Sequence, residues 1–249
     1  MLTGVATSAP ASNGAQFDLE HGERCHTRRS RAALRVRRLY DHAAPRYDSY
    51  RVGWLRAAGA SAESALLADL AHTVRSGHRV LDAGSGTGAV SRHLRELVPA
   101  ANITMVDFSA RMLARAVIAG APRTVGSVLE LPFPDNTFDV VVSAWVIETV
   151  PDPHAVVVEL LRVLAPGGRL FYTFCSRPVS WLALVRSLAL RTVVRWSFAG
   201  RFLGSKRTPW HECAASHRAR FHGGLTTEIA LAKCCTVRDI DAPAIGCKP

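Results

Sequence analysis

The stretch VLDAGSGTGAV, Val80 to Val90, decides the fold class of this chain. It opens with apolar residues typical of a buried strand, passes through three closely spaced glycines, and leads into a segment with helical spacing. Glycines at such a junction let a strand turn sharply into a helix and let the backbone approach a ligand over the helix N-terminus. The stretch therefore predicts a strand, a ligand-binding loop and a helix in succession.

Acidic residues around this loop narrow the class of ligand. The spacing of Gly84, Gly86 and Ala89 fits the relaxed dinucleotide pattern G-x-G-x-x-G/A, which is a weak signal by itself. Asp82 suits a cationic amine better than a pyrophosphate, because a phosphate group prefers amide donors and positive charge. Asp107, at the end of the next predicted strand, suits the two hydroxyls of a ribose. Together the two carboxylates favour a positively charged nucleoside over a dinucleotide.

The rest of the sequence alternates between strand-like and helix-like segments with short connections, as in a parallel sheet covered by helices. The predicted strands are 78–84, 102–107, 138–147, 169–174 and 223–234. The predicted helices are 61–74, 89–97, 110–120, 154–165 and 181–196. We expect Ser61 and Ser109 to cap the first and third of these helices, and Asp152 with Pro153 to begin the fourth. The pattern predicts an α/β fold.

Length and composition indicate how the chain is organised. Its 249 residues, 48% of them apolar, suit one sizeable domain. Residues 1–35 are small, polar and basic, so we expect a flexible tail there and a single domain over 36–249. The tail lacks the apolar core of a secretory signal, and arginines interrupt the longest apolar run. These features predict a cytoplasmic protein without a membrane span.

The positive charge of the chain does not by itself identify a binding partner. The formal net charge is +11, and its densest cluster is RRSRAALRVRR, Arg28 to Arg38. Such a charge allows a nucleic-acid or anionic-membrane partner, or arginines spread over solvated faces. The segment Trp181 to Trp196 carries one apolar stripe at helical spacing beside its arginines. We expect a helix packed on the sheet, with peripheral membrane contact or a cover over the substrate as the alternatives.

Cysteine and histidine patterns favour neither a disulfide framework nor a metal site. The six cysteines contain no C-x-x-C pair, which favours reduced thiols. Residues with metal-binding side chains gather at His211, Cys213, His217 and His222. Their spacing matches no zinc pattern, so we expect no metal. We expect instead a loop that borders the substrate pocket, where Arg218 and Arg220 could contact an acidic acceptor.

Several segments together resemble the class I S-adenosylmethionine-dependent methyltransferases. These segments are VLDAGSGTG at 80–88, ITMVDFSARMLARA at 103–116, and the run from VGSVLELPF to GGRLFYT at 125–173. Upstream, YDHAAPRYD at Tyr40 to Asp48 resembles the N-terminal lid of that family. The resemblance covers Tyr40 to Phe174 and is strongest to the small-molecule branch that includes the ubiquinone/menaquinone methyltransferases.

The resemblance implies a Rossmann-like, doubly wound, mainly parallel sheet of seven strands. It also implies S-adenosylmethionine as the cofactor, S-adenosylhomocysteine as its product, and a small-molecule acceptor. The cofactor residues that it implies are Tyr47, Asp82, Gly84, Ser85, Gly86, Thr87, Gly88, Asp107, Phe108, Met112, Ser127, Val128, Ser143 and Trp145. Asp107 would bind the ribose, Phe108 and Met112 would cover the adenine, and Ser143 to Trp145 would line the methyl-transfer pocket. Strand-end capping by the aspartates and ordinary core packing by Phe108 and Met112 are the alternatives.

The chain departs from the family at two places. The family commonly has Gly-Asp after the third strand, where this chain has Gly126-Ser127, which replaces a charge-assisted hydrogen bond by a neutral one. We therefore expect somewhat weaker cofactor binding. From about residue 176 the sequence diverges and lacks an obvious sixth strand, so the far edge of the sheet is expected to be atypical.

Methyl transfer needs alignment, shielding from water and, for a poorly nucleophilic acceptor, a base. Glu148 and His154 are the candidate catalytic residues, with surface or capping roles as the alternatives. An RNA methyltransferase, favoured by the net charge of +11, and a degenerate fold that only binds a partner are the competing functions. The sequence does not predict the oligomeric state.

Overall fold

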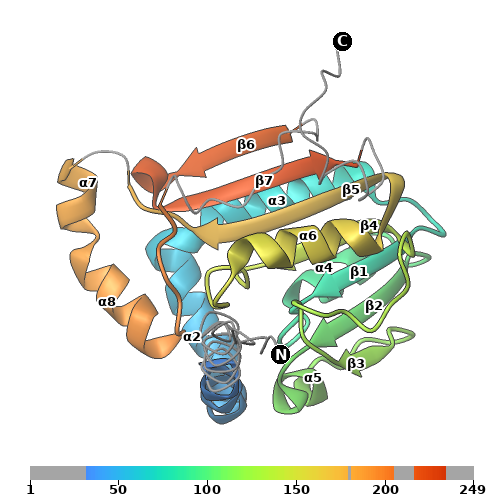
Figure 1. Ribbon diagram of the computed structural model, residues 1–249, viewed down its shortest axis with the longest axis horizontal. Helices are drawn as coiled ribbons and strands as arrows, with labels where there is room; N and C mark the ends of the chain where they lie inside the picture. The colour runs from blue at the N-terminus through green and yellow to red at the C-terminus, as the bar shows by residue number, and fades with distance from the viewer. Residues whose placement is uncertain (1–31, 179–180, 205–215, 234–249) are drawn as a thin grey trace, which may run out of the picture.

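The computed structural model describes residues 32–178, 181–204 and 216–233. Its centre is a seven-stranded sheet with the order β3-β2-β1-β4-β5-β7-β6 (Figure 1). The strands are β1 (Arg79–Ala83), β2 (Asn102–Asp107), β3 (Arg123–Val125), β4 (Phe138–Ala144), β5 (Leu164–Cys175), β6 (Ser216–Phe221) and β7 (Thr226–Ala232). β1 to β5 pair in parallel, whereas β7 pairs antiparallel with both β5 and β6. The expected Rossmann-like, doubly wound and mainly parallel sheet of seven strands is thus confirmed.

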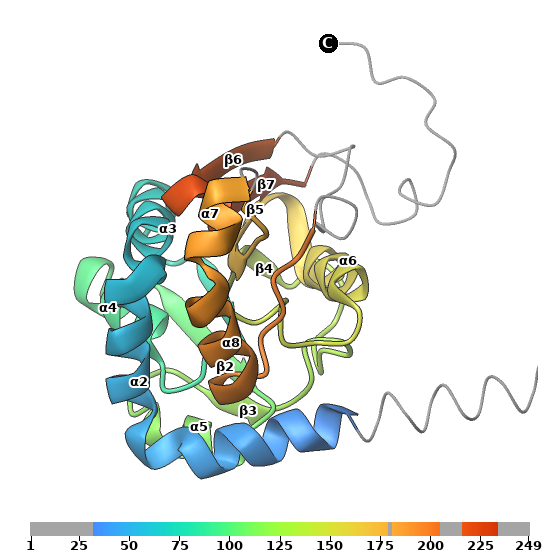
Figure 2. The same ribbon diagram turned by 90° about the vertical axis from the view of Figure 1, so that its left-hand side faces the viewer.

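Helices cover both faces of this sheet. Figure 2 shows α3 and α4 on one side and α6 on the other. The helical segments are 32–43, η1 (Ala44–Arg46), α2 (Tyr47–Trp54), η2 (Leu55–Gly59), α3 (Ala60–Thr73), α4 (Ala89–Leu97), α5 (Ala110–Arg115), α6 (Pro153–Val163), α7 (Trp181–Arg186), α8 (Leu188–Ser197) and η4 (His222–Gly224). The first helix begins at residue 32, four residues before the predicted domain boundary at 36 (36 − 32).

Alternating residues of the central strands enter two separate cores. Tyr172 of β5 and Ile229 of β7 pack with α6, whereas Phe171 and Ala230, next to them in sequence, pack with α3 and α4. Because both faces are covered, the strands are apolar on both sides, as parallel strands between helices require. This is the reason that the valine run of β4 signals a central strand.

Two predicted caps are present and one is wrong. The Ser109 side chain accepts a hydrogen bond from Met112 N (3.1 Å), and Asp152 accepts one from Ala155 N (3.2 Å). Ser61, in contrast, lies inside a continuous helical run from Tyr47 to Thr73, since α2, η2 and α3 follow one another without a break. A helix that continues through this position has no free N–H groups for Ser61 to cap.

The predicted ends of several elements are also wrong. The predicted helix 154–165 ends at Val163, the strand predicted over 169–174 begins at Leu164, and the strand predicted over 223–234 begins at Thr226. α5 ends at Arg115 instead of continuing to Gly120, and β4 ends at Ala144 instead of residue 147. The strand ends there because Trp145 adopts a left-handed backbone conformation with φ 61°, which extended pairing does not accommodate.

The C-terminal part completes the sheet. Residues 216–221, predicted as part of a loop beside the substrate pocket, form edge strand β6, which also places Arg218 and Arg220 on the sheet edge. β6 turns into β7 through His222, Gly223 and Gly224, all at positive φ. The far edge of the sheet is therefore a hairpin and not an incomplete end. His211 and Cys213 lie outside the described residues.

The predicted helix over 181–196 is two helices. α7 ends at Arg186 and α8 begins at Leu188, with Ser187 between them. The expectation that its whole apolar stripe packs on the sheet is wrong, because Trp181, Leu182 and Val185 are exposed. Val194, further along α8, is buried against Trp54 of α2 and Leu225.

Candidate active site

The glycine loop lies where β1 ends and α4 begins. Gly84, Gly86 and Gly88 all have positive φ, at 74°, 56° and 77°. A Cβ at Gly84 would collide with Val146, and one at Gly86 would come within 3.3 Å of Met112 Cε. These glycines therefore serve both the conformation and the close packing of the loop.

Asp107 ends β2 beside this loop and is fixed by backbone donors. Its Oδ2 accepts a hydrogen bond from Gly86 N and its Oδ1 accepts one from Ser109 N, both at 2.8 Å. Burial raises the pKa of the Asp107 carboxyl, and the backbone hydrogen bonds oppose that rise. The carboxylate is thus preorganised at the carboxyl edge of the sheet.

A cavity opens over the loop and Asp107. Its wall includes the predicted residues Tyr47, Gly84, Gly86, Asp107, Phe108, Met112, Ser127, Val128 and Trp145. Its empty volume, counted together with the solvent at its mouth, is about 790 Å³. We call it the loop cavity.

Other predicted cofactor residues lie behind this wall. Asp82 is buried, and its Oδ2 accepts a hydrogen bond from Ser91 Oγ of α4 at 2.6 Å. Burial raises the pKa of Asp82 to about 6. Ser143 Oγ donates to Ala83 O (2.9 Å), so it ties β4 to β1 instead of lining the cavity. Ser85, Thr87 and Gly88 shape the loop without lining the cavity.

Residues of the first helix form a wall of which the sequence predicted only Tyr40, the first residue of the lid-like stretch. Ala33, Val36, Arg37 and Tyr40 line the loop cavity from residues 32–43. Their spacing of three and four residues places them on one helix face, which is the signal that could have identified them. Ser109, Leu129, Ala144, Val146, Thr149, Val150 and Pro151 complete the wall.

Polar contacts fasten this helix and α2 over the loop. Ser109 Oγ donates to Asp41 Oδ1 (2.5 Å), and Thr87 Oγ1 donates to Asp48 Oδ1 (2.6 Å). The Arg37 guanidinium lies 5.7 Å from the centroid of the Phe108 ring, within range of a cation–π contact. Tyr40 to Asp48 is therefore held as a cover, as its lid-like sequence predicts.

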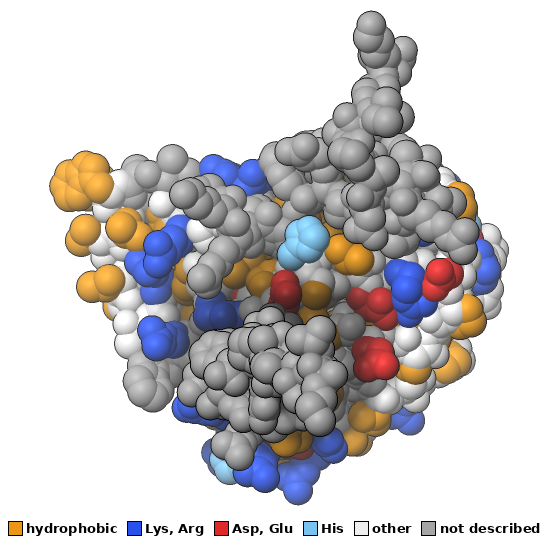
Figure 3. Space-filling view, viewed as in Figure 1, with side chains coloured by type: hydrophobic (Ala, Val, Ile, Leu, Met, Phe, Trp, Pro, Cys, Tyr) orange, Lys and Arg blue, Asp and Glu red, His pale blue; other side chains and the backbone are white. Residues whose placement is uncertain are grey.

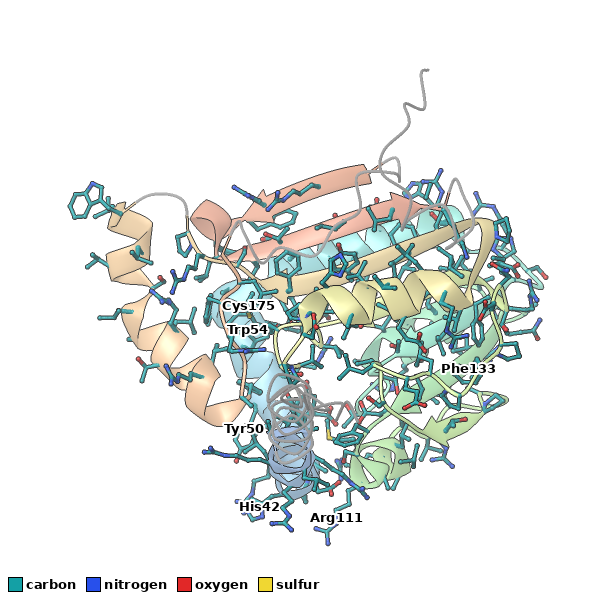
Figure 4. The ribbon with its side chains drawn as sticks, viewed as in Figure 1. His42, Tyr50, Trp54, Arg111, Phe133 and Cys175 are labelled. Carbon is teal, nitrogen blue, oxygen red and sulfur yellow. The ribbon has the colours of Figure 1, made fainter. Side chains whose placement is uncertain are left out.

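A second cavity, which we call the aromatic cavity, adjoins the first. The two share Tyr40, Tyr47, Trp145 and Thr149. The remaining wall of the aromatic cavity consists of Arg51, Trp54, Glu148, Cys175, Val194, Phe198 and Gly200. In Figure 4, Trp54 of α2 and Cys175 at the end of β5 lie close together, and both line the aromatic cavity. The ring centroids of Trp54 and Trp145 are 5.4 Å apart at an interplanar angle of 85°.

Glu148 is the buried carboxyl of the aromatic cavity. The residue is only 3% exposed, and its Oε2 has no hydrogen-bond partner within the part of the chain that the structure describes. Burial raises the pKa of Glu148 to about 7, although hydrogen bonding to Cys175 opposes the shift. A carboxyl that is half ionised near neutral pH can accept a proton from a molecule bound beside it.

Trp145 lines both cavities and is fixed by a polar network. Its indole Nε1 donates to Glu63 Oε2 (3.0 Å), and the other oxygen of Glu63 pairs with the Arg51 guanidinium. This network joins α2, α3 and the segment after β4 at the point where the cavities meet.

His154 does not reach either cavity. It is exposed in the first turn of α6, which Pro153 and the Asp152 cap orient. The structure thus brings Glu148, but not His154, to the candidate site.

The described ranges contain neither a cluster of metal ligands nor a helix that could span a membrane. No group of three or more His, Cys, Asp or Glu residues within 32–178, 181–204 and 216–233 could hold a metal ion. No helix in these ranges has both the length and the apolar character needed to cross a membrane.

The comparisons with known proteins agree with this geometry. Residues 81–172 match a family model described as a methyltransferase domain. This match agrees with the resemblance that the sequence shows to methyltransferases.

Particular relatives define the similarity further. The chain is 38% identical over 161 residues to the demethylmenaquinone methyltransferase of Deinococcus radiodurans, a match that covers 59% of this chain and 63% of the relative. It is 35% identical over 114 residues to the ubiquinone/menaquinone biosynthesis C-methyltransferase UbiE of Saccharophagus degradans, covering 42% and 46%. The matches thus span less than two thirds of the length of either relative. A solved structure described as a possible histamine N-methyltransferase of Thermotoga maritima superposes with a TM-score of 0.56 at 20% identity, covering 79% of this chain and 99% of that one.

Proposed function

We propose that this chain is an S-adenosylmethionine-dependent methyltransferase that acts on a small-molecule acceptor. The observation that carries the proposal is the junction of two cavities, one over the glycine loop and Asp107 and the other around the buried carboxyl of Glu148. A donor and an acceptor placed in adjoining cavities meet at their junction, as an in-line transfer requires.

The residues of the loop cavity fit the cofactor. Asp107 presents a fixed carboxylate to ribose hydroxyls, and Phe108, Met112 and Val128 offer apolar surface to a purine. Gly84 and Gly86 carry no side chain of their own, so their backbone groups are available to the methionine part of the cofactor, beside Val146 and Met112. Ser127 provides one hydroxyl where the family commonly has a carboxylate.

The cofactor, the lid tyrosines and the buried glutamate each have a separate role in the reaction. Bound S-adenosylmethionine supplies an electrophilic methyl group. Tyr40 and Tyr47, held by the lid contacts, exclude water from the junction. Glu148 takes the proton that the acceptor loses, at its unpaired Oε2. This base is effective near neutral pH because its pKa is about 7.

The similarity to ubiquinone and menaquinone methyltransferases supports a quinone-like or other apolar acceptor. The aromatic cavity is consistent with this class, since Trp54, Trp145 and Phe198 offer flat apolar faces.

A labelled-methyl assay tests the proposal without a guess about the acceptor. The protein is incubated with a metabolite extract and isotope-labelled S-adenosylmethionine, and labelled products are identified by mass spectrometry. We expect a labelled small molecule that is absent with Asp107→Ala. Label found only in RNA, with binding that falls steeply with salt, would support the RNA methyltransferase instead. No labelled product from any extract would contradict the proposed activity.

A further inference from the structure

α7 and the start of α8 form an exposed apolar ridge. Its members are Trp181, Leu182, Val185 and Leu188, which are 75%, 52%, 60% and 62% exposed. Figure 3 shows apolar side chains gathered at the left edge of the molecule, over α7 and α8, with basic side chains beside them. Large apolar side chains exposed together on a protein surface indicate an interaction site.

The ridge is not needed to hold these helices on the protein. α8 is anchored by its other side, where Val194 is buried and Leu190 and Phe198 pack with Trp54. Figures 1 and 2 show α7 and α8 to one side of the sheet, away from α6. The two helices thus have one apolar side that serves the core and a second that faces outward.

In the sequence on either side of the ridge, every Asp, Glu, Lys or Arg position is basic. Between Glu159 and Glu212 the sequence contains no Asp or Glu. The basic residues in this interval are Arg162, Arg169, Arg177, Arg186, Arg191, Arg195, Arg201, Lys206 and Arg207. Of these, Arg177 and Arg195 are exposed close to the ridge in sequence. Exposed apolar side chains, among them a tryptophan, combined with arginines alone are the pattern of a segment that lies in the interface of an anionic membrane.

A groove on the inner side of α8 adjoins the aromatic cavity. It runs between α2 and α8, where Tyr50, Leu190 and Val194 line it. It shares Trp54, Val194 and Phe198 with the aromatic cavity. α8 therefore lies between the ridge and this groove, and the groove adjoins the cavity that Glu148 lines.

We propose that the ridge docks this protein on an anionic lipid surface. Docking there brings the groove close to the membrane, so that an apolar acceptor dissolved in the lipid enters along α8. The entry of the acceptor rests on the proposed function, whereas the docking itself does not.

Vesicle co-sedimentation of the full chain tests the docking. Vesicles of phosphatidylcholine alone are compared with vesicles of phosphatidylcholine and phosphatidylglycerol in equal parts. We expect binding to the anionic vesicles and little to the neutral ones. The double variant Trp181→Ser, Val185→Asp should lower the bound fraction by at least ~5-fold, because it removes the largest apolar groups that would enter the interface.

The matched control is Leu97→Asp on α4, where the leucine is 47% exposed and far from α7 in the fold. It changes the net charge by the same amount as Val185→Asp and should bind vesicles as the wild type does. S-adenosylhomocysteine binding by every variant checks that the fold is intact. If the wild-type chain binds vesicles but not this nucleoside, the docking proposal stands and the proposed activity fails.

Two results would overturn the proposal. The first is a failure of the vesicle experiment: either the wild-type protein does not bind anionic vesicles, or the double variant binds them as fully as the wild type. In the latter case the binding would be due to arginines elsewhere and not to the ridge. The second is a dimer, measured by light scattering, that the double variant dissociates. The ridge would then be an interface between two copies of this chain.

Discussion

At the scale of single residues, the catalytic proposal depends on one buried carboxyl. Glu148 is buried, its Oε2 has no hydrogen-bond partner among the described residues, and burial disfavours its charged form. Burial of Glu148 lowers the stability of the fold, but it also gives the carboxyl a pKa of about 7. A general base is most effective when its pKa lies near the pH of the reaction.

Glu148→Gln should lower the rate of methyl transfer by roughly 10²-fold or more, because an amide cannot accept the proton. In the wild type the rate should rise as the pH increases through about 7, where Glu148 ionises, and this limb should vanish in the variant. Initial rates measured between pH 5 and pH 9 show both effects. Binding of S-adenosylhomocysteine should be unchanged.

Glu228→Gln is the matched control for this experiment. Burial also raises the pKa of Glu228 to about 7, but this residue lies on β7 and lines neither the loop cavity nor the aromatic cavity. Its variant should keep the wild-type rate and pH profile. An equal loss in both variants would attribute the effect to lost stability and not to a base.

Gly84→Ala tests the packing of the loop. Gly77→Ala is the control, since Gly77 also has positive φ, 82°, but a Cβ there meets nothing within 4 Å. The strain of a left-handed alanine alone should cost about 1 kcal/mol. Gly84→Ala should cost about 2–4 kcal/mol, because its Cβ also collides with Val146. Urea unfolding measures both, and equal losses would show that the loop can move away from Val146.

At the scale of elements, the lid is held by few contacts. Asp41 and Asp48 each accept one short hydrogen bond from the loop side, from Ser109 and Thr87. We expect Asp41→Ala to speed the dissociation of S-adenosylhomocysteine by roughly 5-fold, which corresponds to about 1 kcal/mol for a lost hydrogen bond. Stopped-flow measurement shows the rate. The control variant Arg38→Ala, on the exposed side of the same helix, should leave the dissociation rate unchanged. If Asp41→Ala also dissociates at the wild-type rate, the hydrogen bond between Ser109 and Asp41 does not hold the lid.

The elements that sequence reasoning identified are those with strong local patterns. The valine run of β4 and the glycine loop before α4 follow from neighbours in sequence. β6 was missed because SHRARF is short, basic and at the sheet edge, where one face needs no apolar residue. The break at Ser187 was missed because the apolar spacing continues across it.

The same limit applies to the candidate site. Asp107 and the loop lie on the cavity wall because their positions at strand ends determine where they face. Position alone did not reveal that Asp82 turns toward Ser91, or that Ser143 turns toward Ala83. Most of the wall formed by residues 32–43 was missed because that helix is remote in sequence from the strands that it covers.

At the scale of the whole molecule, the buried carboxyls should determine how stability depends on pH. Burial raises the pKa of Asp82 to about 6 and of Glu148 and Glu228 to about 7. A carboxyl whose folded-state pKa is raised favours the folded state only while it is protonated. Its contribution is complete below the unfolded pKa, near 4, and is lost as the pH rises through the folded value.

We therefore expect the melting temperature to fall between about pH 4 and pH 7. In Glu228→Gln the free energy of unfolding should fall by about 1–3 kcal/mol less across this pH range than in the wild type, since one titrating group is removed. The fall in melting temperature should be correspondingly smaller. Calorimetric melting at several pH values measures the change. A slope identical to the wild type would show that Glu228 has an ordinary pKa.

The central claim is that the loop cavity binds S-adenosylmethionine, and calorimetric titration with S-adenosylhomocysteine tests it most directly. We predict saturable binding by the wild type and by Asp135→Ala, which removes an exposed aspartate paired with Arg162 on the surface. Asp107→Ala should show no measurable binding, because it loses the carboxylate fixed by Gly86 and Ser109. Absence of binding in the wild type, or undiminished binding by Asp107→Ala, would contradict the account.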